Sequence, residues 1–425
     1  MTAVNRSSLN QYAEHLFDLL HLLRIYKSEK VFSLLARFST GILIIICVVA
    51  NLVLVISELI GLKDAKNVKQ LARGIGLVSF HTTGIVKWCY CMWKIDIITS
   101  LINMLHNCHY LSLQICQNVR DREKLHKEMQ LACKITSIFA YYWPPIGIGA
   151  ALHYCFNPIS FRLYRIYIEK HDSAAIPKIL PLDGWFPWDQ EQYYGYSYFI
   201  QICGVIGCCM GSICYDQLYV STLLIVCSQL RFLSKALRSE NVSAKVTGIA
   251  RFEERLKNCA VQHAKILKYV KELEDVGSPC MFVQCVQNIV ILCLCSFEAA
   301  TLQITSDADC VVNILNLLEF CSGVTVQLFF FCYIASYISS LGLDIAEAAY
   351  ASQWASSFDA LKSKKRYNRR NHKVKYSVLM ITTRAQIPIL LTGGPFYILS
   401  LQTFKSIVGM AVSNAVILSQ VYGEK

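Results

Sequence analysis

Seven stretches of mainly apolar residues divide the chain, and each is long enough to cross a lipid bilayer as an α-helix, which takes about 20 residues. The stretches cover residues 40–61, 71–90, 135–155, 196–220, 281–301, 317–341 and 396–422. The second is the weakest, because it contains Arg73, His81 and Lys87. The pattern predicts an all-α membrane protein in which residues 1–425 form a single domain of seven transmembrane helices.

The distribution of positive charge indicates how these spans are oriented. Cytoplasmic connections of membrane proteins carry an excess of Lys and Arg. The N-terminal segment, residues 1–38, and every second connection after it carry 30 of the 41 Lys and Arg, whereas the opposite set carries 9. We therefore expect a cytoplasmic N-terminus and an extracellular C-terminus, the inverse of a G-protein-coupled receptor.

Two of the cytoplasmic connections have helical periodicity of their own. In residues 251–273 the apolar side chains recur at steps of three and four, with His263 on the same stripe. This predicts an amphipathic helix that continues the fifth span inward, with His263 in a core or an interface. We expect residues 221–280 and 342–392 to form cytoplasmic helical anchor regions, in which the basic run 362–370 is a solvated hairpin near anionic headgroups.

Composition agrees with a membrane protein. The chain is 54% hydrophobic and 16% charged, whereas soluble domains carry about 25% charged residues. The net charge of +12 fits loops that face anionic membrane lipid. No zinc-finger spacing or basic-aromatic module indicates nucleic-acid binding, and no signal peptide precedes the first span.

The sequence contains no pattern typical of an enzyme or of a cofactor site. A nucleophile elbow, a P-loop and a His-Glu-x-x-His motif are all missing from it. Most of the twenty cysteines lie in apolar segments, where they are expected to act as small hydrophobic side chains. The group His106, Cys108, His109 and Cys116 has no paired Cys-x-x-Cys, so no metal site is predicted.

Short motifs occur in three separated parts of the chain. The connection after the third span contains LPLDGWFPWD at 180–189, and the sixth span leads into AEAAYASQW at 346–354. The last span is preceded by RAQIP at 384–388 and GGPF at 393–396, and it opens with LSLQTF at 399–404. In order and spacing, and together with the inverted layout, these motifs resemble the insect odorant receptors over essentially the whole chain.

The resemblance implies a tetrameric cation channel that tuning subunits form with an obligate co-receptor, and that small volatile ligands open directly. The connection between spans four and five is shorter than in the co-receptor, so we expect an odorant-tuning subunit. Its partners would be the co-receptor, in a heterotetramer, and a small volatile odorant in the plasma membrane of a sensory dendrite. A G-protein-coupled receptor or a gustatory-type chemoreceptor is the alternative, and the absence of an internal sequence repeat disfavours a transporter.

The last span, 396–422, carries a polar face inside an apolar helix. Ser406, Met410, Ser413, Ile417 and Gln420 recur at steps of three and four and share one arc. A polar face of this kind is typical of a pore lining. We expect Ile417 to form a hydrophobic constriction and Gln420 a polar ring at the outer mouth, as the resemblance implies. The alternative is that the two serines only allow neighbouring helices to approach closely.

The resemblance places the odorant pocket in the outer half of the bundle, among spans two, three, four and six. On this topology the candidate ligand-binding residues are Phe80, His81, Ile146, Ala150, Tyr154, Tyr198, Phe199, Ile202, Phe320 and Val324. Ile146 and Ala150 are the strongest, because Pro144 and Pro145 should disturb span three and open a cavity beside it. No acidic or basic residue is clearly placed for a charged ligand, so we expect a neutral one.

The predicted orientation places both N-glycosylation sequons, at Asn5 and Asn241, on the cytoplasmic side. Neither asparagine is expected to carry a glycan. Peptide-N-glycosidase treatment of the expressed protein should leave its gel mobility unchanged, while a sequon engineered into the connection at 176–190 should produce a shift. A glycan on Asn241 would contradict the orientation.

Overall fold

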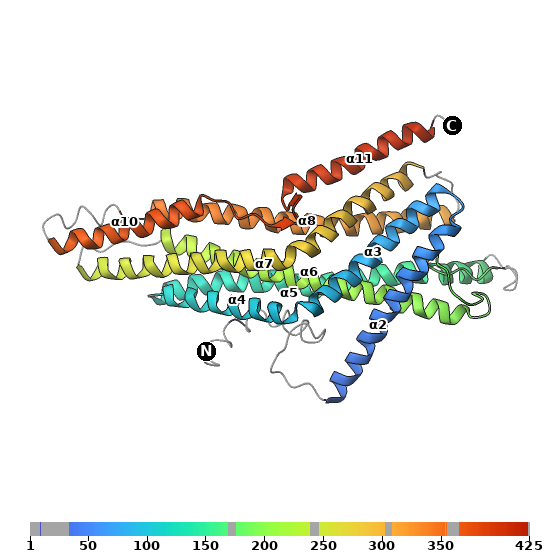
Figure 1. The fold of residues 1–425 in the computed structure, drawn as a ribbon, viewed down its shortest axis with the longest axis horizontal. Helices are drawn as coiled ribbons and strands as arrows, with labels where there is room; N and C mark the ends of the chain where they lie inside the picture. The colour runs from blue at the N-terminus through green and yellow to red at the C-terminus, as the bar shows by residue number, and fades with distance from the viewer. Residues whose placement is uncertain are drawn as a thin grey trace.

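The computed structural model describes residues 9, 34–168, 176–238, 246–301, 308–352, 354 and 365–423. These residues form an elongated helical bundle with one short hairpin (Figure 1). The helices are α2 (Leu34–Gly61), α3 (Val68–Trp93), α4 (Ile95–Ile115), α5 (Val119–Tyr167), α6 (Tyr194–Arg238), α7 (Val246–Ala300), α8 (Ala308–Ala351), α10 (Lys365–Ala385) and α11 (Leu401–Gly423), with a 3-10 turn η1 (Leu62–Asp64).

Apart from residue 301 and residues 396–400, the seven predicted spans lie on helices, namely α2, α3, α5, α6, α7, α8 and α11, which confirms the all-α membrane fold. Length and apolar composition alone identify four of the described helices as candidates to cross a membrane: Gly41–Asp64, Tyr194–Arg238, Ala250–Ala300 and Cys310–Ala351. The spans on α3 and α5 are less apolar, and the charged or titratable residues of α3 have partners inside the bundle.

The last helix begins later than expected. The predicted span started at residue 396, but Tyr397–Ile398 form strand β2, which pairs antiparallel with β1 (Thr392–Gly393). Gly394 at the turn has a φ of +66°, and a Cβ there would lie 2.7 Å from the Phe282 ring. A residue other than glycine is therefore strained at this position, and the backbone reverses direction before the helix can start.

The hairpin and a serine cap position α11. The backbone N–H of Gly394 donates to the Ser278 carbonyl at 3.1 Å and to its Oγ at 2.9 Å, which attaches the turn to α7. The Ser400 Oγ accepts from the backbone N–H of Thr403 at 3.1 Å. Ser400 is therefore the N-cap of the helix. α11 therefore leaves the bundle from a fixed base (Figure 1).

The helix of the fifth span extends beyond the span, as the periodicity predicted. α7 continues without a break from the fifth span through residues 251–273, and His263 on the apolar stripe is buried. The basic run was expected to be a hairpin, but from Lys365 it forms the start of α10 instead. Val374, Val378 and Ile381 recur at steps of four and three and are buried, and this apolar stripe makes the segment helical despite its many charges.

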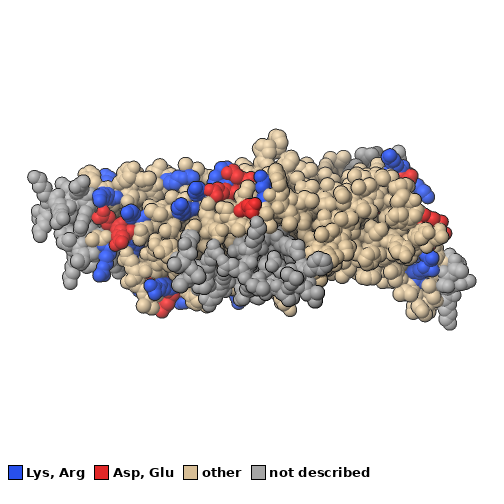
Figure 2. All heavy atoms as spheres, turned by 60° about the horizontal axis from the view of Figure 1, so that its bottom comes forward, with Lys and Arg blue, Asp and Glu red and all other residues tan. Residues whose placement is uncertain are grey.

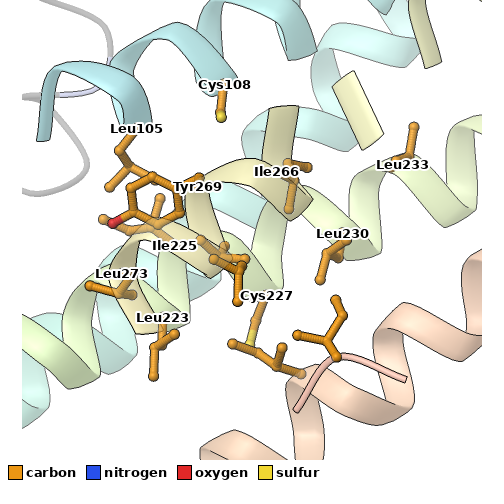
Figure 3. Packing of buried hydrophobic residues seen from close by; sticks show 14 of the residues in the cluster. Leu105, Cys108, Leu223, Ile225, Cys227, Leu230, Leu233, Ile266, Tyr269 and Leu273 are labelled. Atoms are coloured by element: carbon orange, nitrogen blue, oxygen red, sulfur yellow. The ribbon is translucent and has the colours of Figure 1, made fainter. Parts of the chain in front are cut away.

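The largest hydrophobic core lies in this extended part of the bundle, between α4, α6, α7, α8 and α10. Figure 3 shows residues of α4, α6 and α7 that point toward one another: Leu105, Cys108, Leu223, Ile225, Cys227, Leu230, Leu233, Ile266, Tyr269 and Leu273. Burial of each large side chain contributes about 1.5–3 kcal/mol. Nearby on α4, burial lowers the pKa of His109 to about 4, with a contribution from His106, so the ring is neutral at pH 7.

The charged and apolar side chains on the outer surface are distributed as in a protein that crosses a bilayer. On the face shown in Figure 2, Lys, Arg, Asp and Glu gather over one half of the molecule and again at the opposite end, and a stretch between them is uncharged. Large apolar side chains of the predicted spans are exposed, among them Leu43, Ile45, Ile138 and Leu318. Exposed apolar area of this extent requires an apolar environment, and the protein is therefore a multi-pass membrane protein.

Each charged or titratable side chain that made the second span look weak has a partner on another helix. The Arg73 guanidinium lies against the Glu298 carboxylate on α7, and His81 Nδ1 is 2.9 Å from Glu58 Oε2 on α2. The third such contact joins the Lys87 ammonium of α3 to the Asp216 carboxylate of α6.

The Lys87 ammonium and the Asp216 carboxylate form a buried ion pair. Lys87 Nζ is 2.9 Å from Asp216 Oδ1, and both side chains are almost fully buried. Gln327 on α8 donates to the other carboxylate oxygen, and Gln284 on α7 donates to Gln327 at 3.0 Å. The network therefore satisfies the buried charges and links α3, α6, α7 and α8.

Removal of one partner of this pair should destabilise the fold. Lys87→Met leaves the Asp216 charge buried without its counter-ion, so we expect the free energy of unfolding to fall by about 3–5 kcal/mol. The measurement is thermal unfolding of the purified protein in detergent. Lys66→Met, at an exposed lysine, is the control. The double variant Lys87→Met with Asp216→Asn should recover most of the loss, and equal melting of the single and double variants would contradict a paired role.

Candidate functional site

A cavity of about 290 Å³ lies between α3, α5, α6 and α8. Its walls are mainly apolar, and a few polar side chains converge on it. It is lined by Leu77, Phe80, His81, Trp143, Ile146, Gly147, Ala150, Ala151, Tyr154, Leu182, Val205, Cys209, Ser212, Ile213, Asp216, Asn316, Glu319, Phe320, Ser322, Gly323, Val324 and Gln327. A mainly apolar cavity with few polar groups is typical of a site for a small molecule.

Small residues on α5 leave space for the cavity, and a close contact between α3 and α6 lies next to it. Gly147, Ala150 and Ala151 on α5 leave space at its wall. A Cβ at Gly84 of α3 would lie 2.5 Å from Cys208 Sγ of α6, so these two helices touch next to the cavity without a gap. Close contact through small residues is typical of membrane helices.

Helix α5 continues through the proline pair that was expected to disturb it. It runs unbroken from Val119 to Tyr167 with Pro144, Pro145 and Pro158 inside it. The cavity does lie beside the proline pair, at Trp143, Ile146 and Gly147. The small side chains that follow the prolines, rather than an interruption of the helix, leave this space.

The structure brings together seven of the ten residues proposed for ligand binding. They are Phe80, His81, Ile146, Ala150, Tyr154, Phe320 and Val324. Phe80 and Phe320 meet edge to face with ring centroids 5.6 Å apart, so α3 and α8 close one side. Ile146 is also largely exposed on the outside of α5, which makes this wall a single residue thick.

The other three candidates, all on α6, do not line the cavity. The Tyr198 hydroxyl donates to the Cys155 carbonyl, Phe199 is 62% exposed, and Ile202 packs at the edge of the apolar cluster that also contains the cavity residues Val205 and Cys209. They lie before Val205, the first residue of α6 that reaches the cavity. The cavity thus lies against α6, but further along the helix than these three residues.

Several polar residues line the cavity that sequence reasoning did not select, namely Ser212, Asp216, Asn316, Glu319 and Gln327. Helical spacing could have identified Gln327 as a cavity residue, because it follows Phe320 by seven residues and Val324 by three, on the same face of α8. The charged groups among them are paired. Asp216 contacts Lys87, and Glu319 Oε2 is 2.8 Å from His153 Nδ1.

A second, larger cavity of about 480 Å³ adjoins the first. The two share Leu77, Tyr154 and Asn316 as lining residues. The second cavity is more polar, and the Arg73–Glu298 ion pair forms part of its wall. It is also lined by residues 176–177 and 179–181 of the connection between α5 and α6. It therefore forms a vestibule between this connection and the apolar cavity.

The five residues proposed to line a pore all lie on one exposed face of α11. Ser406, Met410, Ser413, Ile417 and Gln420 are exposed. On the opposite face, Ile407 and Ala411 are buried in an apolar cluster with residues of α7 and α8. α11 is thus fixed to the bundle by its apolar face and presents its more polar face outward.

Known proteins with similar sequences belong to one class. A family model described as 7tm Odorant receptor matches residues 67–412. The chain is 26% identical over 286 residues to odorant receptor 10 of Aedes albopictus, covering 65% of this chain and 66% of that protein. It is 23% identical over 304 residues to putative odorant receptor 98b of Drosophila melanogaster, covering 69% of this chain and 71% of that protein.

A solved structure has the same fold. The insect olfactory receptor OR5 from Machilis hrabei superposes with a TM-score of 0.74 at 14% sequence identity, covering 97% of this chain and 99% of that one. The same receptor in complex with eugenol also superposes with a TM-score of 0.74, at 15% identity.

Filling the cavity should block a ligand that binds there. In Ala150→Phe the added ring occupies the space beside α5, so we expect the agonist concentration for half-maximal response to rise about tenfold or more. Ala299→Phe, on an exposed position of α7 outside the cavity, is the matched control. Dose–response curves are to be compared at equal surface expression. An unchanged potency of every agonist in Ala150→Phe would remove this cavity as the ligand site.

Proposed function

The chain belongs to the seven-transmembrane odorant receptor family, and from this premise we propose that it is the odorant-binding tuning subunit of a heteromeric ligand-gated cation channel. In this proposal a small neutral volatile binds in the cavity between α3, α5, α6 and α8. The observation that carries the channel part is the face of α11 on which all five proposed pore residues are exposed together.

The cavity supports a small and mostly apolar ligand. Its volume of about 290 Å³ is at the lower limit for small-molecule sites. The Asp216 carboxylate that faces it is already paired with the Lys87 ammonium, and the Glu319 carboxylate lies 2.8 Å from His153 Nδ1. A charged ligand would have to displace one of these partners, whereas a neutral one leaves both contacts intact. The complex of Machilis hrabei OR5 with eugenol is consistent with a ligand of this kind.

The exposed face of α11 supports a pore that forms between subunits. Its serines and Gln420 offer polar groups to hydrated cations, and Ile417, 57% exposed, offers an apolar ring that excludes water when closed. A single copy leaves this face uncovered. In a tetramer four such faces would surround one axis, and α11 of the tuning subunit would meet α11 of the co-receptor.

The route from ligand to pore follows from the packing of α8. Val324 lines the cavity, and it belongs to the same buried cluster as Ile407 and Ala411 of α11. One turn further along α8, Phe329 meets Phe404 of α11 edge to face at 5.5 Å between ring centroids. We propose that ligand contact with α8 moves α11 through this apolar contact.

The orientation in the membrane remains part of the proposal. Residues 1–38 and the extended part of the bundle, 221–280 and 342–392, would lie in the cytoplasm as anchor regions, and the chain would end outside the cell. The location would be the dendritic plasma membrane of a sensory neuron, and the co-receptor the obligate partner. Sequon Asn241 and most of residues 1–38 lie outside the described residues.

The test of the channel is whole-cell current in cells that express this chain with and without an insect co-receptor, with G-protein signalling blocked. A fast inward cation current evoked by volatiles only in the co-expressing cells is the expected result. A response that the G-protein block abolishes would contradict the channel and favour metabotropic signalling.

The gate role of Ile417 gives a second prediction. Ile417→Ala removes most of the apolar ring, so the closed pore should hydrate more readily and the basal current should rise several-fold. Val412→Ala removes apolar volume from a different exposed position of the same helix and should leave the basal current unchanged. Equal basal currents in both variants, at equal surface expression, would argue against a gate at Ile417.

A further inference from the structure

Among the described residues, two hydroxyl groups that line the cavity have no hydrogen-bond partner: that of Tyr154, where the cavity adjoins the vestibule, and that of Ser212. Ser212 on α6 lines the cavity with only 9% of its surface exposed. Serines and threonines in this bundle commonly donate to a carbonyl of the preceding turn, as Ser112 does to Cys108 and Thr222 to Leu218. Within the described residues the Ser212 hydroxyl makes no such hydrogen bond and none to another side chain.

The other polar groups at this end of the cavity are occupied. His81 contacts Glu58, and Gln327 donates to the Asp216 carboxylate. Ser322 lines the cavity too, but its hydroxyl donates to the Glu319 carbonyl at 3.0 Å. Ser212 is therefore the hydroxyl at this end of the cavity that is still available to a ligand.

The position of Asp216 decides which ligand group fits. Ser212 and Asp216 are one helical turn apart on α6 and both line the cavity, so a group beside one is also near the other. Asp216 Oδ1 accepts from Lys87 and Oδ2 from Gln327, and each carboxylate oxygen has a second lone pair. A ligand that accepts from Ser212 and donates towards Asp216 satisfies both, which a carbonyl oxygen or a hydrocarbon cannot do.

We propose that Ser212 is a specificity-determining residue that selects volatiles with one hydroxyl group on a compact apolar body, namely small alcohols and phenols. The Ser212 Oγ–H donates to the ligand oxygen, and the ligand O–H points to the Asp216 carboxylate. The apolar remainder of the ligand packs against Phe320 and Val324. This inference rests on the proposed function, because it needs the cavity to be the odorant site.

The experiment compares pairs of volatiles that differ by a hydroxyl in place of a methyl group: 4-methylphenol with p-xylene, benzyl alcohol with ethylbenzene, and 1-hexanol with heptane. Esters and ketones of similar size complete the panel. Currents are recorded from this chain with its co-receptor, for the parent protein and for Ser212→Ala, Ser212→Thr and Ser322→Ala, at equal surface expression.

The hydroxyl member of a pair should be the more potent agonist on the parent receptor. Ser212→Ala should weaken that member about fivefold to tenfold, the loss of one hydrogen bond, and should leave its hydrocarbon partner unchanged. Ser212→Thr keeps the hydroxyl and should keep the preference. Ser322→Ala removes a hydroxyl that is already bonded within the helix, so the preference should persist.

Three results would overturn the assignment of Ser212: equal potency within pairs, an equal loss for both members in Ser212→Ala, or activation by esters, ketones or hydrocarbons but by no hydroxyl compound. A current from no volatile at all, with complexes present at the surface, would instead contradict the proposed function itself.

Discussion

The ion pair between Lys87 and Asp216 is the interaction on which the arrangement of the membrane part depends. A charge inside a bilayer is costly unless it is paired and hydrogen-bonded. Here the ammonium on α3 meets the carboxylate on α6 at 2.9 Å, and Gln327 of α8 completes the carboxylate shell. The pair fixes the depth and rotation of α3 against two other helices. Because Asp216 and Gln327 also line the cavity, the same interaction sets one end of the proposed ligand site.

The extended part of the bundle is more densely packed than the membrane part. The extended part of the bundle is a continuous apolar core, in which Tyr269 and its neighbours are fully buried. The membrane part contains the cavity and its vestibule. In the proposed function, a rigid base and a less densely packed membrane part would allow a small ligand to shift α8 without unfolding the bundle. α11 contacts α8 through the Phe329–Phe404 pair and through the Leu401 N–H that donates to Ser336 Oγ, and we propose that this contact transmits the shift.

Hydrophobic patterning predicted the membrane helices and the amphipathic extension at 251–273, because burial along a helix leaves a periodic trace in the sequence. It failed where local backbone geometry decides: Gly394 creates a turn, so the last helix starts at Leu401 rather than at 396. Hydrophobic patterning also could not identify the partners of charged groups, because Lys87 and Asp216 are 129 residues apart in the sequence. The helices of the cavity could be predicted, but Tyr198, Phe199 and Ile202 lie before Val205, where α6 first lines the cavity, and only the packing of α6 against α3 and α5 defines this depth.

The most direct measurement is a cryo-electron microscopy structure of the complex with the co-receptor and a bound agonist, identified first by current recording. The account predicts ligand density between α3, α5, α6 and α8, beside Ala150 and Phe320, with the Lys87–Asp216 pair intact. It also predicts that α11 lines the central pore through Ser413, Ile417 and Gln420. Density at another site, with this cavity empty and unchanged from the unliganded complex, would contradict it.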